Sequence, residues 1–238
     1  MEGTHIEYRV EDKYIVTDSD IAVLSKRLGL VMQQDAHQQG DCYEIRSIYF
    51  DDLLDSCMEE NEAGVNLRRK YRIRTYGAAD APLKLEIKEK KNGLIRKTSA
   101  ALSREEYDEL LAGGVDTAFG EKPVLNELLL RMRMDGMRAK ALVVYERTAY
   151  VHPSGNVRIT FDRNIAVSRD FDSFWETRVA GAVPVLPAGY HVLEVKYDEM
   201  LPDMIARQLE TGKLRQTAFS KYYLGRLALG GEFLHSGE

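Results

Sequence analysis

The segment from Val192 to Tyr197 (VLEVKY) most constrains what this chain can fold into. It consists of β-forming residues in which charged and apolar side chains alternate. Because successive side chains of a strand point to opposite faces, Glu194 and Lys196 share one face and Val195 lies on the other. Taken alone, the pattern is typical of any half-buried strand.

The same alternation recurs in four other segments of the chain. Their charged or polar residues are Glu11 and Lys13, Arg72 and Arg74, Glu86 and Lys88, and Arg158 with Thr160 and Asp162. For Arg72 and Arg74 alone, a strand face turned to water explains the pattern equally well, because charge runs usually face solvent. Repetition in strand after strand instead favours a barrel with a charged interior.

Length and composition limit the class of protein. A chain of 238 residues, 44% hydrophobic and 30% charged, can form one globular domain over residues 1–238. Its net charge of -5 gives no reason to expect nucleic acid as a partner. Cys42 and Cys57 have no metal-ligand spacing, which favours a reducing, cytoplasmic location. We expect no signal peptide and no membrane span, because no apolar run approaches the roughly 18 residues that a span needs.

Periodicity and turn residues predict an α+β fold built around antiparallel strands. We expect strands at residues 5–16, 43–51, 66–76, 83–91, 94–102, 139–151 and 157–162, the last extended by 165–168, and at 192–197. Helices are expected near residues 21–29, 52–61, 103–112, 202–209 and 218–229, with another opened by Pro123. Asn92 and Gly93 are a strong hairpin signal, and Ser103 with Glu106 forms a capping box.

The residues expected to face inward carry a large positive surplus. Three are carboxylates, Glu11, Glu86 and Glu194. Nine are cations: Lys13, Arg72, Arg74, Lys88, Lys97, Arg147, Arg158, Lys196 and Lys221. Such a cluster is costly if dry and empty, so water or anions must accompany it. Several phosphates in a row fit best, because arginine matches phosphate oxygens with two parallel hydrogen bonds.

The carboxylates predict a divalent metal. Glu194, together with Glu11 or Glu86, provides the ligands that Mg²⁺ or Mn²⁺ takes in addition to phosphate oxygens. The sequence has no glycine-rich loop of the kind that cradles a nucleotide ahead of Lys-Ser or Lys-Thr, which excludes a P-loop.

Eight motifs in order resemble the polyphosphate polymerase domain of the vacuolar transporter chaperone complex, a branch of the triphosphate tunnel metalloenzymes. The similarity runs from about residue 7 to residue 229. The motifs are EDKY at 11–14, SIYFD at 47–51, RIRTY at 72–76, EIK at 86–88, RTAY at 147–150, RITFD at 158–162, LEVK at 193–196 and FSKY at 219–222.

The resemblance implies an eight-stranded antiparallel tunnel barrel that uses ATP and a divalent metal, Mn²⁺ or Mg²⁺, to extend a polyphosphate chain. It implies that Glu194 binds the metal and that Ser220 contacts phosphate at the tunnel mouth. The cations that it implies for the triphosphate or the product chain are Lys13, Arg72, Arg74, Lys88, Lys97, Arg147, Arg158 and Lys221. Lys196, Glu11 and Glu86 complete the expected substrate-binding set.

Three functions stay open at this point. A polymerase would transfer the γ-phosphate of ATP to polyphosphate, whereas a triphosphate hydrolase on the same barrel would use water, and a third reading is a non-catalytic polyphosphate or nucleotide-binding module. The adenylate cyclase and thiamine triphosphatase branch typically opens with Glu-x-Glu-x-Lys, but Arg9 stands at the first position here. The sequence lacks the transmembrane part of the eukaryotic complex, so export of the product would need a separate membrane partner.

Overall fold

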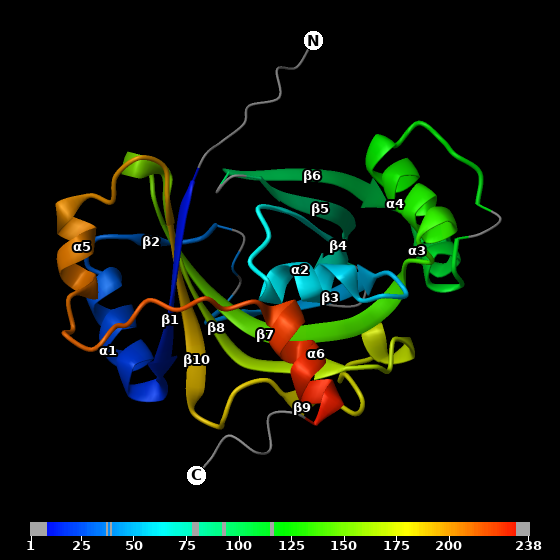
Figure 1. Cartoon of the computed structure of the whole chain (residues 1–238). Coiled ribbons are helices and arrows are strands. Elements are labelled where there is room, and N and C mark those ends of the chain that lie inside the picture. Colours follow the sequence, from blue (N-terminus) through cyan, green and yellow to red (C-terminus); the bar gives the residue numbers. More distant parts are fainter. Residues whose placement is uncertain are drawn as a thin grey trace. The chain divides into compact units, whose positions relative to one another are not determined.

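The computed structural model describes residues 9–36, 38, 40–77, 81–91, 94–114 and 117–231 (Figure 1). Ten strands are β1 (Val10–Thr17), β2 (Gln33–Gln34), β3 (Tyr43–Asp51), β4 (Leu67–Tyr76), β5 (Leu83–Lys91), β6 (Leu94–Leu102), β7 (Arg138–His152), β8 (Val157–Ser168), β9 (Val183–Pro184) and β10 (Tyr190–Tyr197). The α-helices are α1 (Asp18–Leu28), α2 (Ser56–Glu62), α3 (Arg104–Leu111), α4 (Pro123–Met134), α5 (Asp203–Leu209) and α6 (Lys221–Gly230). Short 3₁₀ turns occupy Ser154–Asn156 and Asp172–Phe174.

The strands form one sheet in the order β1-β10-β8-β7-β3-β4-β5-β6, while β2 pairs with β7 and β9 with β8. The predicted α+β fold with eight antiparallel strands is confirmed. Residues 5–8 of the first predicted strand lie outside the described residues, as do Asn92 and Gly93. On either side of these two residues, β5 and β6 pair antiparallel from Lys91 and Leu94 onward, as the predicted hairpin requires.

Contacts divide the chain into two compact units. Unit 1 is Met1–Glu44, Tyr145–Ala166 and Pro184–Ser220, and unit 2 is Ile45–Val144, Val167–Val183 and Lys221–Glu238. Strands β3, β7, β8 and β9 each contribute residues to both units. The expectation of a single domain over residues 1–238 stays a prediction.

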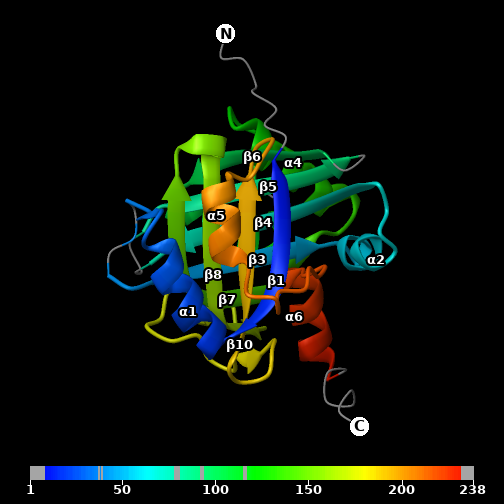
Figure 2. The same ribbon diagram turned by 90° about the vertical axis from the view of Figure 1, so that its left-hand side faces the viewer.

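In unit 1, α1 and α5 cover one face of β1, β10 and β8 (Figure 2). Leu24 and Leu28 of α1 and Ile205 of α5 pack in one buried cluster with apolar residues of the strands, among them Ile159 and Val195. Helix α1 begins with a capping box in which Thr17 and Asp20 exchange hydrogen bonds. This core fixes which face of the strands is apolar, and so leaves the charged residues on the other face.

In unit 2, α4 packs against β5 and β6. Its apolar stripe, which includes Leu125 and Leu128, is buried, and the Tyr71 hydroxyl of β4 donates a hydrogen bond to Glu127 Oε1 at 3.1 Å. The predicted capping box of Ser103 and Glu106 is present at the start of α3. None of the helices in the described part of the chain has the length and apolarity that crossing a bilayer requires.

Candidate functional site

Unit 1 holds the first group of predicted site residues, on the face of β1, β10 and β8 opposite α1 and α5. In the register of these strands, Lys13 lies opposite Glu194, and Glu11 lies opposite Lys196. Lys196 in turn lies opposite Arg158. The alternation seen in the sequence therefore places these residues on one face. The name mixed-charge cluster is used below for Glu11, Lys13, Asp35, Arg147, Arg158, Asp162, Glu194 and Lys196.

Two lysines and two carboxylates form the centre of the mixed-charge cluster. The Glu11 carboxylate lies 2.9 Å from Lys13 Nζ and 3.7 Å from Lys196 Nζ. Lys196 also forms an ion pair with Glu194, which is only 5% exposed. Lys13 Nζ donates a hydrogen bond to the Phe219 carbonyl oxygen at 2.9 Å, which ties β1 to the residue just before Ser220.

Two arginines are held by separate aspartates. Arg147 makes a bidentate contact with the fully buried Asp162, with Nε–Oδ1 2.6 Å and Nη2–Oδ2 2.7 Å. Burial disfavours its charge, but the carboxylates of Asp162 and Glu194 outweigh burial and raise the pKa of Arg147. Arg158 forms an ion pair with Asp35 and donates from Nη2 to the Tyr43 hydroxyl at 3.2 Å. Asp35 could not be identified from the sequence, because it lies in a polar stretch with the composition of a loop.

The donor set of unit 1 fits a hard divalent cation. Glu194 and Glu11 project from neighbouring strands and share Lys196 as a partner. Mg²⁺ and Mn²⁺ complete their coordination with phosphate oxygens and water, so one or two carboxylates suffice. No group of three or more acidic, histidine or cysteine ligands occurs among the described residues. A metal here would therefore depend on its substrate for most of its ligands.

Unit 2 holds the second group, on one face of β4, β5 and β6. The register places Arg72 opposite Glu86 and Lys70 opposite Lys88, and Lys88 lies opposite Lys97. Arg74 lies two residues beyond Arg72 and so shares the face. Arg72, Arg74, Glu86, Lys88 and Lys97 are called the cation cluster below.

The Glu86 carboxylate forms ion pairs with three of these cations. Glu86 Oε2 lies 2.7 Å from Arg72 Nη2 and 3.9 Å from Arg74 Nη1, and Oε1 lies 3.0 Å from Lys97 Nζ. Glu86 is 2% exposed. Burial raises its pKa, but the charges of Arg72, Arg74 and Lys97 more than compensate and lower the pKa to about 2. Glu86 is therefore ionised at any ordinary pH and forms ion pairs with these three cations.

Tyr49 is a member of this environment that the sequence analysis missed. Its hydroxyl accepts a hydrogen bond from Arg72 Nη1 at 3.1 Å, and its ring stacks on Tyr222 at 5.2 Å between centroids. Burial opposes ionisation of the phenol, yet the charges of Arg72, Arg74 and Lys221 lower its pKa to about 7. In the structure Tyr49 lies directly opposite Arg72, but the two residues belong to different segments of the chain, so the sequence offered no signal for the contact.

Side-chain hydrogen bonds connect helix α6 to the end of β3 and to the residue before α2, and so position the first residue of α6, Lys221. The Tyr222 hydroxyl donates to the buried Asp51 at 2.6 Å. Arg226 makes two hydrogen bonds of 2.8 Å to the Asp55 carboxylate, and Lys140 Nζ lies 3.0 Å from the same group. Tyr222 and Arg226 thus hold in place a helix whose first residue, Lys221, is in the predicted site.

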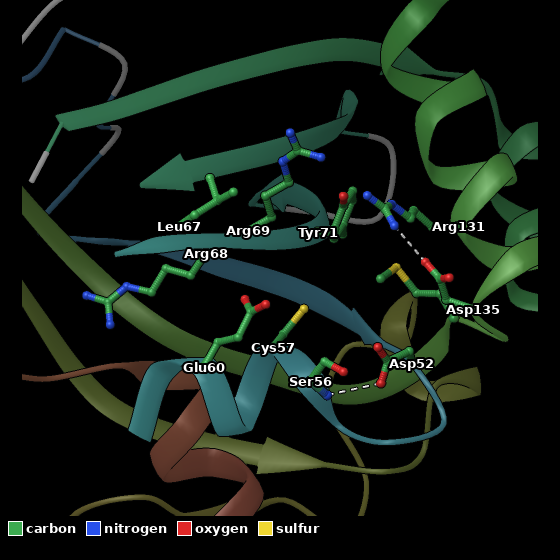
Figure 3. Close-up of a pocket in the computed structure, with 11 residues that line it drawn as sticks. Asp52, Ser56, Cys57, Glu60, Leu67, Arg68, Arg69, Tyr71, Arg131 and Asp135 are labelled. Atoms are coloured by element: carbon green, nitrogen blue, oxygen red, sulfur yellow. Dashed lines mark hydrogen bonds and ion pairs between the residues drawn. The ribbon is translucent and has the colours of Figure 1, made fainter. Parts of the chain in front are cut away.

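A pocket of about 380 Å³ lies elsewhere in unit 2, between α2 and β4 (Figure 3). Cys57 and Glu60 point into it from α2, and Arg69 and Tyr71 line it from β4. Since Arg69 and Tyr71 alternate with the residues of the cation cluster, the pocket is on the other face of β4. None of the predicted site residues lines it.

Comparison with known proteins gives a family and a fold. The family profile described as the VTC domain matches residues 8–229. A Bacillus halodurans protein described as a candidate adenylate cyclase is similar in structure at TM-score 0.53 and 14% identity, over 90% of this chain and 94% of that one. A Hippeastrum protein is named as a candidate adenylyl cyclase with a dominant triphosphatase activity. It is similar in structure at TM-score 0.53 and 14% identity, over 92% of this chain and 95% of that one. A Pyrococcus horikoshii protein is similar in structure at TM-score 0.50 and 16% identity, over 95% of this chain and 99% of that one. No curated protein matches in sequence.

Proposed function

The chain belongs to the VTC domain family, and on that premise we propose that it is a polyphosphate polymerase dependent on ATP and a divalent metal. It transfers the γ-phosphate of ATP to the end of a growing polyphosphate chain. The observation that carries the proposal is the cation cluster, where Arg72, Arg74, Lys88 and Lys97 share a strand face with one carboxylate, Glu86.

The cation cluster supports binding of a polyanion. Partly buried cations in excess of carboxylates require anions or water nearby. Arginine offers a planar fork that matches two phosphate oxygens, and lysine adds a compact charge that tolerates several positions. A chain of phosphates presents the same charged oxygens at every unit. The arrangement of Arg72 and Arg74 with Lys88 and Lys97 therefore suits a repeating phosphate ligand.

The mixed-charge cluster supports the metal-dependent part of the reaction. Glu194, with Glu11 beside it, would hold Mn²⁺ or Mg²⁺ once Lys196 gives up its carboxylate partners. When bound, the metal supplies positive charge that stabilises the phosphoryl group in transfer. Lys13 and Arg147 add fixed positive charge on this face, and Asp162 holds the Arg147 guanidinium in one orientation.

The proposed reaction needs no nucleophile from the protein. An oxygen of the terminal phosphate of the acceptor attacks the γ-phosphorus of ATP in line, a new P–O bond forms, and the bond to ADP breaks. The electron pair of the broken bond leaves with ADP. The role of the protein is to position the two phosphates and to stabilise charge on the equatorial oxygens.

The first test is incubation of purified protein with ATP and Mn²⁺, with and without a short polyphosphate primer, and separation of the products on a gel. Long chains that are lost in Glu194→Ala would support a polymerase with Glu194 at the metal. Release of free phosphate without chains would replace the polymerase by a hydrolase. Tight triphosphate binding without turnover would leave a binding module.

A triphosphate hydrolase is the second candidate, and the Hippeastrum protein with a dominant triphosphatase activity is the observation that favours it. The same residues would bind the triphosphate, with water in place of the phosphate acceptor. The free cysteines Cys42 and Cys57 support a reducing, cytoplasmic location for either activity. A separate membrane partner would be needed to export the product.

A further inference from the structure

The hydroxyl of Thr160 lies on the charged face of β8 without a role in the chemistry above. Thr160 is 3% exposed, and its Oγ1 makes no hydrogen bond to any other residue that the structure describes. In the register of the strands Thr160 lies directly opposite Glu194. Lys13 lies opposite Glu194 from the other side, so the three residues occupy one row across β1, β10 and β8.

Neither strand formation nor packing explains the hydroxyl. Valine has the same branched shape and the same preference for strands, and it has no polar atom to leave unsatisfied. A buried hydroxyl without a partner destabilises the folded protein. Another buried threonine of unit 1 shows the usual arrangement, because Thr148 Oγ1 donates to the Asp41 carbonyl oxygen at 2.8 Å.

The charged neighbours of Thr160 on this face are already engaged. Glu194 pairs with Lys196, Arg158 pairs with Asp35, and Asp162 accepts both hydrogen bonds from Arg147. None of these carboxylates accepts a hydrogen bond from Thr160 Oγ1 in the described part of the chain, so its proton is left without an acceptor. A phosphate oxygen supplies one, and Lys13 next to Glu194 provides positive charge for the same phosphate.

We propose that Thr160 donates a hydrogen bond from Oγ1 to a phosphate oxygen of the triphosphate at the Glu194 position. The inference rests on the proposed function and adds a second neutral hydroxyl to a predicted binding set in which Ser220 is the one uncharged residue. A hydrogen bond to a charged oxygen changes a binding constant by roughly 10-fold to 100-fold. Its loss is therefore measurable.

The test is calorimetric titration of inorganic tripolyphosphate with Mn²⁺ into wild-type protein and three variants, with a thermal melt of each variant without ligand. Thr160→Val removes the hydroxyl and keeps the shape, whereas Thr160→Ser keeps the hydroxyl. We expect Thr160→Val to melt at or above the wild-type temperature and to bind at least about tenfold more weakly. Thr160→Ser should bind close to wild type.

Thr148→Val is the matched control. It removes a satisfied hydroxyl outside the mixed-charge cluster, so it should melt at a lower temperature and bind as wild type does. Wild-type affinity in Thr160→Val would overturn the inference. Failure of the wild-type protein to bind tripolyphosphate would overturn the proposed function itself, and the wild-type titration alone decides that. If Thr160→Val does not fold, Thr160→Ala compared with Thr160→Ser decides the question by the same affinities.

Discussion

The mixed-charge cluster and the cation cluster use similar residues in opposite proportions. In unit 1, four cations (Lys13, Arg147, Arg158, Lys196) form ion pairs with four carboxylates (Glu11, Asp35, Asp162, Glu194). In unit 2, four cations (Arg72, Arg74, Lys88, Lys97) share a face with one carboxylate, Glu86. Counted over the described residues that make up each cluster, the first is balanced, whereas the second has more positive than negative charges.

The difference shows how one alternating pattern can form both a site suited to a metal with its phosphates and a site suited to an anion. A balanced cluster can exchange internal ion pairs for a metal and its phosphates, because carboxylates are present to receive the cation. A cluster with surplus charge is stabilised by adding an anion. The lowered pKa values of Glu86 and Tyr49, both next to Arg72, are a local consequence of that surplus.

The largest expected effect comes from removing the metal ligand of the balanced cluster. Glu194→Gln keeps the size of the side chain and loses its charge, so we expect turnover to fall by about 10²-fold to 10³-fold. Binding of Mn²⁺ in the presence of tripolyphosphate, followed by calorimetry, should be lost in parallel. Glu146→Gln is the control, because Glu146 is on β7 and accepts from Asn164 Nδ2 at 3.1 Å, outside the cluster. Equal losses in both variants would show that the carboxylate of Glu194 has no special role.

The second effect concerns stability, and it tests the surplus of charge in unit 2. The pKa of Glu86 falls from 4.5 to about 2 on folding, which corresponds to about 3 kcal/mol at neutral pH. Since the folded-state pKa is the lower one, this contribution is complete above pH 4.5 and is lost as the pH falls toward 2. Denaturant titration at pH 7 should therefore show that Glu86→Gln is less stable than wild type. Between pH 4.5 and pH 2, Glu86→Gln should lose less stability than wild type does.

Tripolyphosphate should raise the melting temperature of Glu86→Gln more than that of wild type, because the anion takes the place of the missing carboxylate. Glu89→Gln is the matched control on the other face of β5, where Glu89 pairs with Arg69 at 2.6 Å and Arg96 at 3.2 Å. Pairs near the surface contribute at most about 1 kcal/mol. If Glu89→Gln destabilised the protein as much as Glu86→Gln, the cation cluster would not be the source of the effect.

Much of this arrangement could be predicted from the sequence, because alternation is a local property. Once Ile159 and Val195 are assigned to the core, Arg158 and Lys196 must lie on the other face. Capping residues fixed the starts of α1 and α3 in the same local way. The fold and the common faces of the charged pairs therefore followed from residues close together in the chain.

The partners of each charge could not be predicted, because they come from distant segments. Asp35 reaches Arg158 from a loop, and Tyr49 reaches Arg72 across 23 positions. Asp55 holds Arg226 across 171 positions. Alternation predicts the strand face on which a side chain lies, but not the residue that contacts it there. The balance of charge in the two clusters could therefore be determined only from the structure.

The third effect tests the geometry of the surplus cations. Arg72→Lys keeps the charge and loses the planar fork, so affinity for tripolyphosphate should fall by about tenfold, the value of one charge-assisted hydrogen bond. Arg69→Lys is the control from the same strand, because Arg69 lies on the opposite face and pairs with Glu89. Titration calorimetry measures both. An equal loss in the two variants would assign the affinity to the general charge of β4 rather than to the cation cluster.

The smallest effect is the pH dependence that Tyr49 introduces. With a pKa of about 7 against the ordinary 10.0, the phenolate favours the folded state, and this contribution is complete above pH 10 and lost as the pH falls through 7. A bound polyphosphate repels the phenolate and competes for the same cations. Binding should therefore take up a proton above pH 7 and weaken by a few-fold, on the order of 2-fold to 5-fold, as the pH rises.

Ultraviolet titration of wild-type protein should show one tyrosine ionising near pH 7, and Tyr49→Phe should lack it. Tyr71→Phe is the control, since Tyr71 lies on the other face of the sheet with its pKa raised to about 12 by burial and by Glu127. Tripolyphosphate titrates in the same range, so the informative quantity is the difference between the binding profiles of wild type and Tyr49→Phe. Identical binding profiles for wild type and Tyr49→Phe would mean that solvent ions already neutralise the surplus charge of the cation cluster. The two clusters would then differ in their number of ion pairs, but not in the electrostatic potential that a ligand meets.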